Sequence, residues 1–150
     1  MSPKKYLKPT SYFRKIRLIC AKVVLYLKIP LKKTVTVDSY EIVFLVTSFL
    51  EYFLRAEESY TRETVTMHWI RSYVGPDDVV IDIGANIGAY SLLIGKMMQV
   101  GKGCVYAIEP EAANYAALNQ NIFLNGLSEK IVAYSFAFGD SRRASHFYLS

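Results

Sequence analysis

The sequence predicts an α/β domain with a doubly wound, mostly parallel sheet. Three observations predict it: strand-like and helix-like segments alternate from residue 77 onward, a glycine-rich turn follows the first of these strands, and 52% of the 150 residues are hydrophobic. Alternating β and α segments are typical of parallel sheets, whose ligands bind at the carboxyl ends of the strands. We therefore expect one folded core with a ligand at that edge.

Residues 1–33 form a basic N-terminal segment, with ten Lys and Arg and no acid, in a chain of net charge +5. Lysines interrupt its apolar stretch, which is shorter than the ~20 apolar residues that a spanning helix needs. Four apolar residues recur at helical spacing: Ile16, Ile19, Val23 and Leu27. This pattern fits either a membrane-interfacial helix or a solvated basic arm packed on the domain. No nucleic-acid-binding motif is present, so we expect no nucleic acid partner.

Residues 34–76 read as a lead-in of strand and helix. Residues 34–37 (TVTV) form a β-branched strand candidate, whereas residues 41–54 are an apolar run that fits a buried helix or a strand followed by a helix. Thr61 is placed to cap a helix that ends at Val74-Gly75-Pro76.

Residues 77–150 carry the alternating unit. Residues 79–83 (VVIDI) are apolar enough for a strand buried on both faces, as parallel strands are. The expected elements that follow are a helix over 87–98, a strand over 104–109, a helix over 110–124 with Glu111 in its first turn, and a strand over 131–138.

The glycine-rich turn IDIGANIG (81–88) predicts a bound ligand. Gly84 and Gly88 let a ligand approach the backbone, Asn86 tolerates a left-handed conformation, and the turn's N–H groups are expected to face the ligand. Glu109 ends the second strand 21 residues after Gly88, where an acid accepts hydrogen bonds from ribose hydroxyls. The turn and the acid together predict an adenosine-containing cofactor.

The residue types in the turn favour S-adenosylmethionine over a nicotinamide dinucleotide. Asn86 and Ala89 stand where the dinucleotide fingerprint has its second and third glycines, and a pyrophosphate needs the second one for close approach. Asp82, at the strand end, is able to order the loop and attract an ammonium or sulfonium charge. A nicotinamide-dependent oxidoreductase remains the alternative enzyme, and a non-catalytic, basic, membrane-associated module that retains the fold is the alternative from another class.

Residues 59–150 resemble the FkbM family of S-adenosylmethionine-dependent methyltransferases. The resemblance rests on VVIDIGANIGAYSLLIG, VYAIEPEAANYAALNQNIFLNGL and FAFGD, with SYTRETVTMHWI ahead of them. It implies a Rossmann-like class I methyltransferase fold and methyl transfer to a sugar or polyketide hydroxyl. The residues that it implies for the methionine-side loop are Asp82, Gly84, Asn86 and Gly88. It also implies that Glu109 binds the ribose and that Asn121 and Asn125 support the second helix and its exit. By the same resemblance, Glu63 approaches the amino acid end of the cofactor, and Phe138 or Asp140 approaches the adenine.

The sequence departs from that family in extent, because only three strands of a seven-stranded sheet are expected after residue 77. The acidic segment that helps build the acceptor side in the family is absent from these residues, so the fold is expected to be truncated after the third strand. We therefore expect a cofactor-binding half domain, no assignable catalytic residue, a small-molecule or glycan methyl acceptor, and a second chain able to complete the sheet. An additional strand is considered at residues 145–150.

Two cysteines and two histidines suggest no further chemistry. Cys20 and Cys104 lack the spacing of a zinc or disulfide site and are interpreted as small buried hydrophobes in a cytoplasmic protein, peripheral at the membrane if residues 1–33 bind it. His68 and His146 have no partners at ligand spacing, so no metal is expected.

Overall fold

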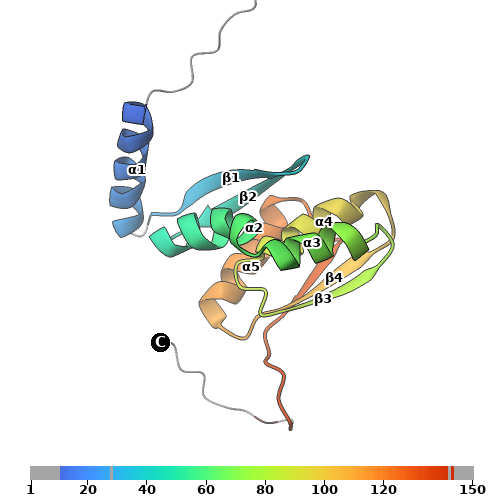
Figure 1. Ribbon diagram of the computed structural model, residues 1–150. Coiled ribbons are helices and arrows are strands. Elements are labelled where there is room, and N and C mark those ends of the chain that lie inside the picture. Colours follow the sequence, from blue (N-terminus) through green and yellow to red (C-terminus); the bar gives the residue numbers. More distant parts are fainter. Residues whose placement is uncertain (1–10, 28, 142, 144–150) are drawn as a thin grey trace, which may run out of the picture.

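The computed structural model describes residues 11–27, 29–141 and 143, and it arranges the chain in three layers. A β-hairpin forms the first layer, helices form the second, and a three-stranded parallel sheet forms the third (Figure 1). The parallel sheet with helices after its strands confirms the predicted α/β class.

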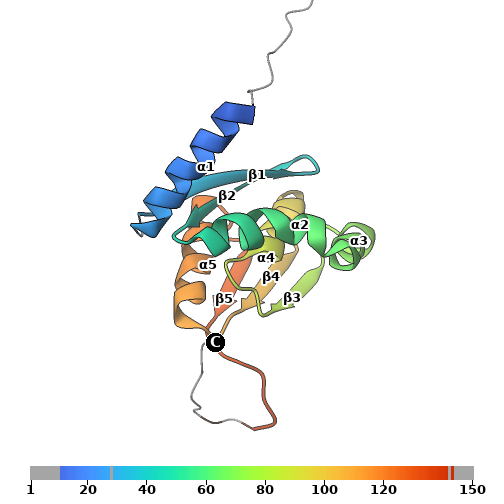
Figure 2. The same ribbon diagram turned by 60° about the vertical axis from the view of Figure 1, so that its left-hand side comes forward.

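The N-terminal part consists of a helix and a hairpin. Helix α1 (Ser11–Tyr26) lies beside one end of the hairpin, away from the parallel sheet (Figure 2). Strands β1 (Leu31–Val37) and β2 (Tyr40–Val46) pair antiparallel through a tight turn in which Asp38 takes a φ of 54°. The predicted strand at residues 34–37 is confirmed, and the apolar run that starts at residue 41 is a strand followed by a helix.

The helical segment after the hairpin is broken into three parts. These are the π-helix η1 (Glu51–Glu58), helix α2 (Ser59–Arg62) and helix α3 (Thr64–Tyr73). The break falls at Glu63, whose φ of −94° and ψ of 67° are not helical. The predicted cap at Thr61 is wrong, because its hydroxyl donates to the Glu58 carbonyl of the preceding turn instead of accepting from the next helix.

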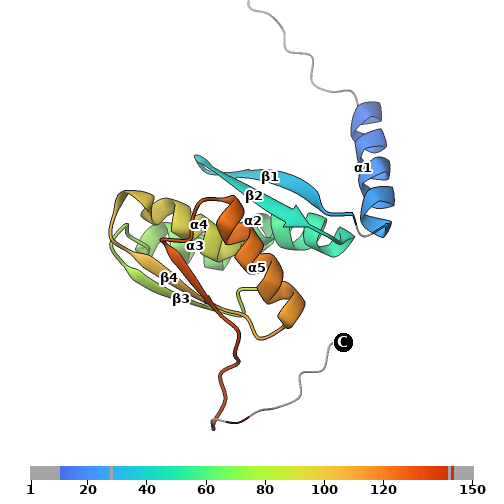
Figure 3. The ribbon, with the colours of Figure 1, turned by 180° about the vertical axis from the view of Figure 1, so that it is seen from behind.

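The parallel sheet has the order β3 (Val79–Ile83), β4 (Cys104–Ile108) and β5 (Ile131–Tyr134). Helix α4 (Ala89–Met97), with the 3-10 turn η2 (Met98–Val100), and helix α5 (Ala112–Leu124) connect the strands. Both helices lie between the sheet and the hairpin (Figure 3). Glu111 is the N-cap of α5 instead of a first-turn residue, and two backbone N–H donors there, from Ala113 and Asn114, lower the pKa of its carboxyl.

One face of the parallel sheet is covered and the other is exposed. Val80, Val105 and Ile131 point to the helices and are buried, whereas Val79, Ile81 and Ile83 of β3 are 64, 58 and 65% exposed. The exposed face continues with four residues at and beyond β5: Val132, Tyr134, Phe136 and Phe138. The expectation that residues 79–83 are buried on both faces is therefore wrong within the described part of the chain, because the side chains of Val79, Ile81 and Ile83 stay more than half exposed there. The third strand also ends at Tyr134 instead of residue 138.

Two buried asparagines on α5 hold the hairpin against the helices. The Asn125 carboxamide accepts a hydrogen bond from the Val43 N–H at 2.9 Å and donates one to the Val43 carbonyl at 2.6 Å. The Asn121 carboxamide accepts from the Leu45 N–H at 2.7 Å and donates to the Ile87 carbonyl at 2.9 Å. These side chains pair with the edge of β2 as a neighbouring strand would, and Asn121 also ties the hairpin to the glycine-rich turn.

We expect Asn125→Ala to destabilise the chain by about 1–3 kcal/mol, because it leaves both backbone groups of half-buried Val43 without their partner. Urea unfolding followed by circular dichroism measures the change. Asn119→Ala is the matched control, since the Asn119 amide bonds only to the Tyr115 carbonyl of its own helix and is exposed. Equal losses in the two variants would show that the hairpin contact contributes nothing specific.

Candidate functional site

The turn between β3 and α4 takes the left-handed conformation at three of its five residues. Gly84, Asn86 and Gly88 have φ values of 82°, 53° and 94°. A Cβ at Gly84 would meet nothing within 4 Å, whereas a Cβ at Gly88 would lie 2.7 Å from Leu118 Cδ1 of α5. Of these two glycines, Gly84 therefore faces open space. The missing side chain at Gly88 makes room for helix packing, and contact of Gly88 with a ligand stays a prediction.

The backbone N–H groups of residues 84–88 are all bonded within the protein. Those of Gly84 and Ala85 donate to the Ile108 carbonyl at 2.8 and 3.0 Å, and that of Gly88 donates to the Ala85 carbonyl at 2.8 Å. The Asn86 N–H donates to Glu109 Oε2 at 2.8 Å, and the Ile87 N–H donates to Asn86 Oδ1 at 2.9 Å. The expectation that these donors face a ligand is therefore wrong, since the turn uses them to hold its own shape.

Glu109 is the buried anchor of the turn. Its side chain follows β4 and is 5% exposed. Besides the bond from Asn86, its Oε1 accepts from the Glu111 N–H at 2.9 Å and from the Asn114 amide at 3.5 Å. A carboxylate has about four acceptor positions, so Glu109 retains capacity for a ligand hydroxyl.

Asp82 of β3 lies near Glu109 and faces α4. The Ser91 hydroxyl donates to its Oδ2 at 2.6 Å. Burial raises the pKa of the Asp82 carboxyl, and the bonds from Ser91 oppose that rise only in part. The turn is thus flanked by Asp82 in β3 and by Glu109 directly after β4. Both carboxyl groups accept hydrogen bonds from neighbouring parts of the fold.

The raised pKa of Asp82 predicts a pH-dependent stability. The folded chain keeps a proton on Asp82 at pH values where the unfolded chain, with an ordinary Asp pKa of about 3.9, has released it. The stability from this proton is complete below the unfolded pKa and is lost as the pH rises through the folded pKa. We therefore expect Asp82→Asn to gain stability relative to the wild type from about pH 4 upward. Urea unfolding of both proteins across this range tests the expectation, and a stability difference that does not change with pH would contradict it.

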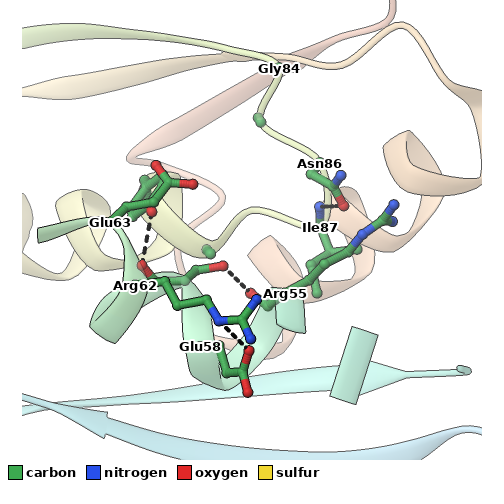
Figure 4. A pocket seen from close by; sticks show the side chains of 11 residues that line it. Arg55, Glu58, Arg62, Glu63, Gly84, Asn86 and Ile87 are labelled. Carbon is green, nitrogen blue, oxygen red and sulfur yellow. Dashed lines mark hydrogen bonds and ion pairs between the residues drawn. The ribbon is translucent and has the colours of Figure 1, made fainter. Parts of the chain in front are cut away.

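A pocket of about 340 Å³ opens beside the turn. Gly84, Ala85 and Asn86 form one wall, and residues from η1, α2 and the break after α2 form the other. Figure 4 shows the four charged residues of the second wall, which are Arg55, Glu58, Arg62 and Glu63. The mouth of the pocket therefore carries two cations and two anions.

The charged residues of the pocket are held in part by one another. Arg62 Nε lies 2.7 Å from Glu58 Oε2, one helical turn away. That oxygen is buried and receives no aligned hydrogen bond from the described residues. Arg55 reaches across to α5, where its Nη1 donates to Asn114 Oδ1 at 2.7 Å. The ion pair with Arg62 therefore already uses Glu58 Oε2.

Two tyrosines fix the pocket walls relative to each other. The hydroxyl of buried Tyr60 on α2 donates to the Ala89 carbonyl at 2.7 Å, and the hydroxyl of Tyr90 on α4 donates to the Ser59 carbonyl at 2.9 Å. Their rings contact edge to face with centroids 6.2 Å apart. Burial raises the pKa of both hydroxyls, which therefore stay protonated donors at neutral pH.

The residues predicted for the site fall into two groups. Glu63 lines the pocket with Gly84 and Asn86, and Glu109 supports the turn from behind. Phe138 and Asp140 lie in the exposed segment after β5 and do not line this pocket, so their contact with an adenine ring stays a prediction. Reading the sequence missed Arg55, Glu58 and Arg62. The only local signal was the i,i+4 spacing of Glu58 and Arg62, which is common on exposed helices.

Cysteine and histidine add nothing to this site. Cys20 is exposed and Cys104 is half-buried, so the expectation that both are buried is wrong. His68 is exposed on α3, and His146 lies outside the described residues, as does the strand considered at 145–150. Within the described ranges, no group of three or more His, Cys, Asp or Glu residues is placed to hold a metal ion.

Comparison with known protein families identifies the family to which this chain is similar. Residues 55–146, more than half of the chain, match the sequence model of the TRM5/TYW2 methyltransferase domain. The match supports the S-adenosylmethionine-dependent methyltransferase class expected from the sequence, and it names a family other than FkbM. None of the curated proteins compared with the chain matches it.

Solved structures share the fold. A Pyrococcus horikoshii protein described as a transferase is 25% identical, with a TM-score of 0.50, over 71% of this chain and 36% of that one. P. horikoshii TYW2 in complex with MeSAdo is 22% identical, with a TM-score of 0.50, over 87% of this chain and 51% of that one. The chain thus matches about a third of the first structure's length and about half of the second's.

Proposed function

Because this chain belongs to the TRM5/TYW2 methyltransferase domain family, we propose that it binds S-adenosylmethionine beside Gly84 and serves as the cofactor half of a methyltransferase. One observation carries the proposal: a ligand-sized opening lies beside Gly84, between the Glu109-anchored turn and a wall with charges of both signs. When bound, this cofactor supplies an electrophilic methyl group on a sulfonium, which moves to an acceptor atom that loses a proton.

The residues around the opening fit each part of this cofactor. Its amino acid end carries a carboxylate and an ammonium, which Arg55 or Arg62 and Glu58 or Glu63 match in charge. Glu58 and Glu63 supply the negative charge that an ammonium requires, and Arg62 already shares Glu58 Oε2 at 2.7 Å. Glu109 has acceptor capacity left for ribose hydroxyls.

The alternative of a nicotinamide dinucleotide fits the turn poorly. Its pyrophosphate is bound by free backbone N–H groups in the first β-α turn, and the second glycine of the fingerprint admits it. Here the N–H groups of residues 84–88 are all bonded within the protein, and Asn86 occupies the position of that glycine. S-adenosylmethionine carries no phosphate and does not need those donors.

The acceptor is proposed to be a hydroxyl of a sugar or polyketide, as the FkbM resemblance implies. In support, the pocket mouth combines Glu58 and Glu63 with Arg55 and Arg62, so it offers a polyanion no net attraction. A tRNA nucleoside is the second candidate, because Trm5-type enzymes act on tRNA. We further propose that a second polypeptide brings the acceptor side, since β3 exposes an apolar face and an unpaired edge in the described structure.

Calorimetric titration with S-adenosylhomocysteine, the product, tests the cofactor proposal. Saturable binding by the folded chain is expected, and no binding in a chain that circular dichroism shows to be folded would overturn it. Transfer of a radioactive methyl group from S-adenosylmethionine to a panel of hydroxylated sugars and polyketides, beside unmodified tRNA, tests the acceptor. Label in tRNA alone would replace the first acceptor candidate with the second, and binding without transfer would agree with a separate acceptor side.

A further inference from the structure

Helix α1 exposes an apolar stripe on one side while its other side packs inward. Leu18, Ala21 and Val24 are half-buried. The exposed stripe recurs every three or four residues and comprises Ile16, Ile19, Val23 and Tyr26, the last three being 61, 55 and 87% exposed. A helix that is apolar on both sides gains stability only when a second partner covers the exposed side.

The stripe continues onto neighbouring residues. Leu27 and Ile29 follow α1 and are exposed, as are Phe49 and Leu50, which come after β2. A shallow pocket lined by Lys15, Leu18, Ile19, Lys22 and Phe49 joins the helix to this second segment. The apolar side chains therefore form one surface, here called the α1 surface, made of the exposed residues of α1 with residues 27, 29, 49 and 50.

Positive charge borders the α1 surface. Lys15 and Lys22 are exposed along the stripe, and the Lys22 ammonium lies 5.1 Å from the centroid of the Phe49 ring. Lys32 is exposed at the start of β1. No Asp or Glu precedes Asp38 in the sequence, so no acid of the first 37 residues offsets these lysines.

We propose that the α1 surface binds a membrane that contains anionic lipids, with α1 lying in the plane of the interface. Apolar side chains that enter the headgroup boundary, beside lysines that meet lipid phosphates, are the arrangement that interfacial helices use. Lysine stems are also able to lie along apolar surface while their ammonium groups reach the headgroups. In the described part of the chain, no helix is long and apolar enough to span a membrane.

Lipid explains the α1 surface better than RNA does. RNA phosphates would bind the lysines, but they would leave Ile16, Ile19 and Val23 exposed to water. Surfaces that bind single-stranded RNA add aromatic platforms on which bases stack, whereas most of this stripe is aliphatic. Unlike RNA, a lipid interface uses the apolar and the basic residues together.

Sedimentation of the full chain with vesicles tests the proposal. Phosphatidylcholine vesicles with and without phosphatidylserine are compared at low and high salt, and we expect binding only to the anionic vesicles, weaker at high salt. The double variant Ile19→Ser/Val23→Ser removes apolar contact and keeps the charge, and Lys15→Gln/Lys22→Gln does the reverse. The lysine variant is expected to lower binding roughly tenfold or more, since each lysine near an anionic surface contributes about fivefold. The Ile19→Ser/Val23→Ser variant is also expected to lower binding roughly tenfold or more, because it removes two apolar side chains that would enter the headgroup boundary.

Matched controls change the same residue types elsewhere. Val65→Ser/Val100→Ser alters two exposed valines, and Lys102→Gln alters an exposed lysine, all away from α1. These variants are expected to bind vesicles as the wild type does. Wild-type binding that the α1 variants do not reduce relative to these controls would overturn the proposal. A second result would also overturn it: no binding to anionic vesicles, together with equal binding of an RNA oligonucleotide by the wild type and by Ile19→Ser/Val23→Ser. That result would assign the α1 surface to RNA.

Discussion

Replacement of Glu109 by alanine is expected to weaken S-adenosylhomocysteine binding by about 1–3 kcal/mol, or roughly tenfold to a hundredfold. The carboxylate accepts the N–H groups of Asn86 at 2.8 Å and Glu111 at 2.9 Å, so its loss leaves both donors unpaired and frees the turn. It also removes the acceptor proposed for the ribose hydroxyls. Calorimetric titration of wild type and variant measures the loss.

Two further variants separate these contributions. Glu109→Gln keeps one acceptor oxygen and the shape of the side chain, so it is expected to retain more of the turn and to lose mainly the charge-assisted bonds. Glu129→Ala removes an exposed acid in the turn before β5 and is expected to bind as the wild type does. If Glu109→Ala stays folded and binds with unchanged affinity, Glu109 has no part in the cofactor site.

The sequence predicted those parts of the fold that local patterns encode. Three apolar strands, the helices between them and the turn at Gly84 follow from residue type and short-range spacing, and the structure places them where expected within a few residues. The acid at Glu109 was found because strand ends in a parallel sheet meet at one edge. These features need no knowledge of which distant segments pack together.

The remaining parts depend on contacts between distant segments. Arg55 and Arg62 reach the pocket because η1 and α2 fold back over the turn, guided by the Tyr60 and Tyr90 hydrogen bonds, and no spacing rule connects them to Gly84. The resemblance implied that Asn121 supports its own helix, whereas its amide bonds to β2 and to the turn. Burial of Ile81 depends on whether another segment covers this face of the sheet, and the sequence of its own strand does not contain that information.

The two glycines of the turn are expected to rank in opposite order when alanine variants are compared in stability and in cofactor binding. Gly88→Ala places a Cβ 2.7 Å from Leu118 Cδ1 at a φ of 94°, so strain and overpacking should together cost about 2–4 kcal/mol of unfolding free energy. Gly84→Ala meets no atom within 4 Å and has a φ of 82°, so it should lose only about 1–2 kcal/mol. Its methyl group, however, enters the opening proposed for the cofactor.

Stability and binding measured on the same two variants therefore test the site without removing any charged group. Urea unfolding should rank Gly88→Ala as the less stable variant. Titration with S-adenosylhomocysteine, corrected for the folded fraction, should rank Gly84→Ala as the weaker binder. Opposite rankings cannot come from a general loosening of the turn, because that would lower both quantities in the same order. Identical rankings in the two measurements would mean that the space above Gly84 is not where the cofactor lies.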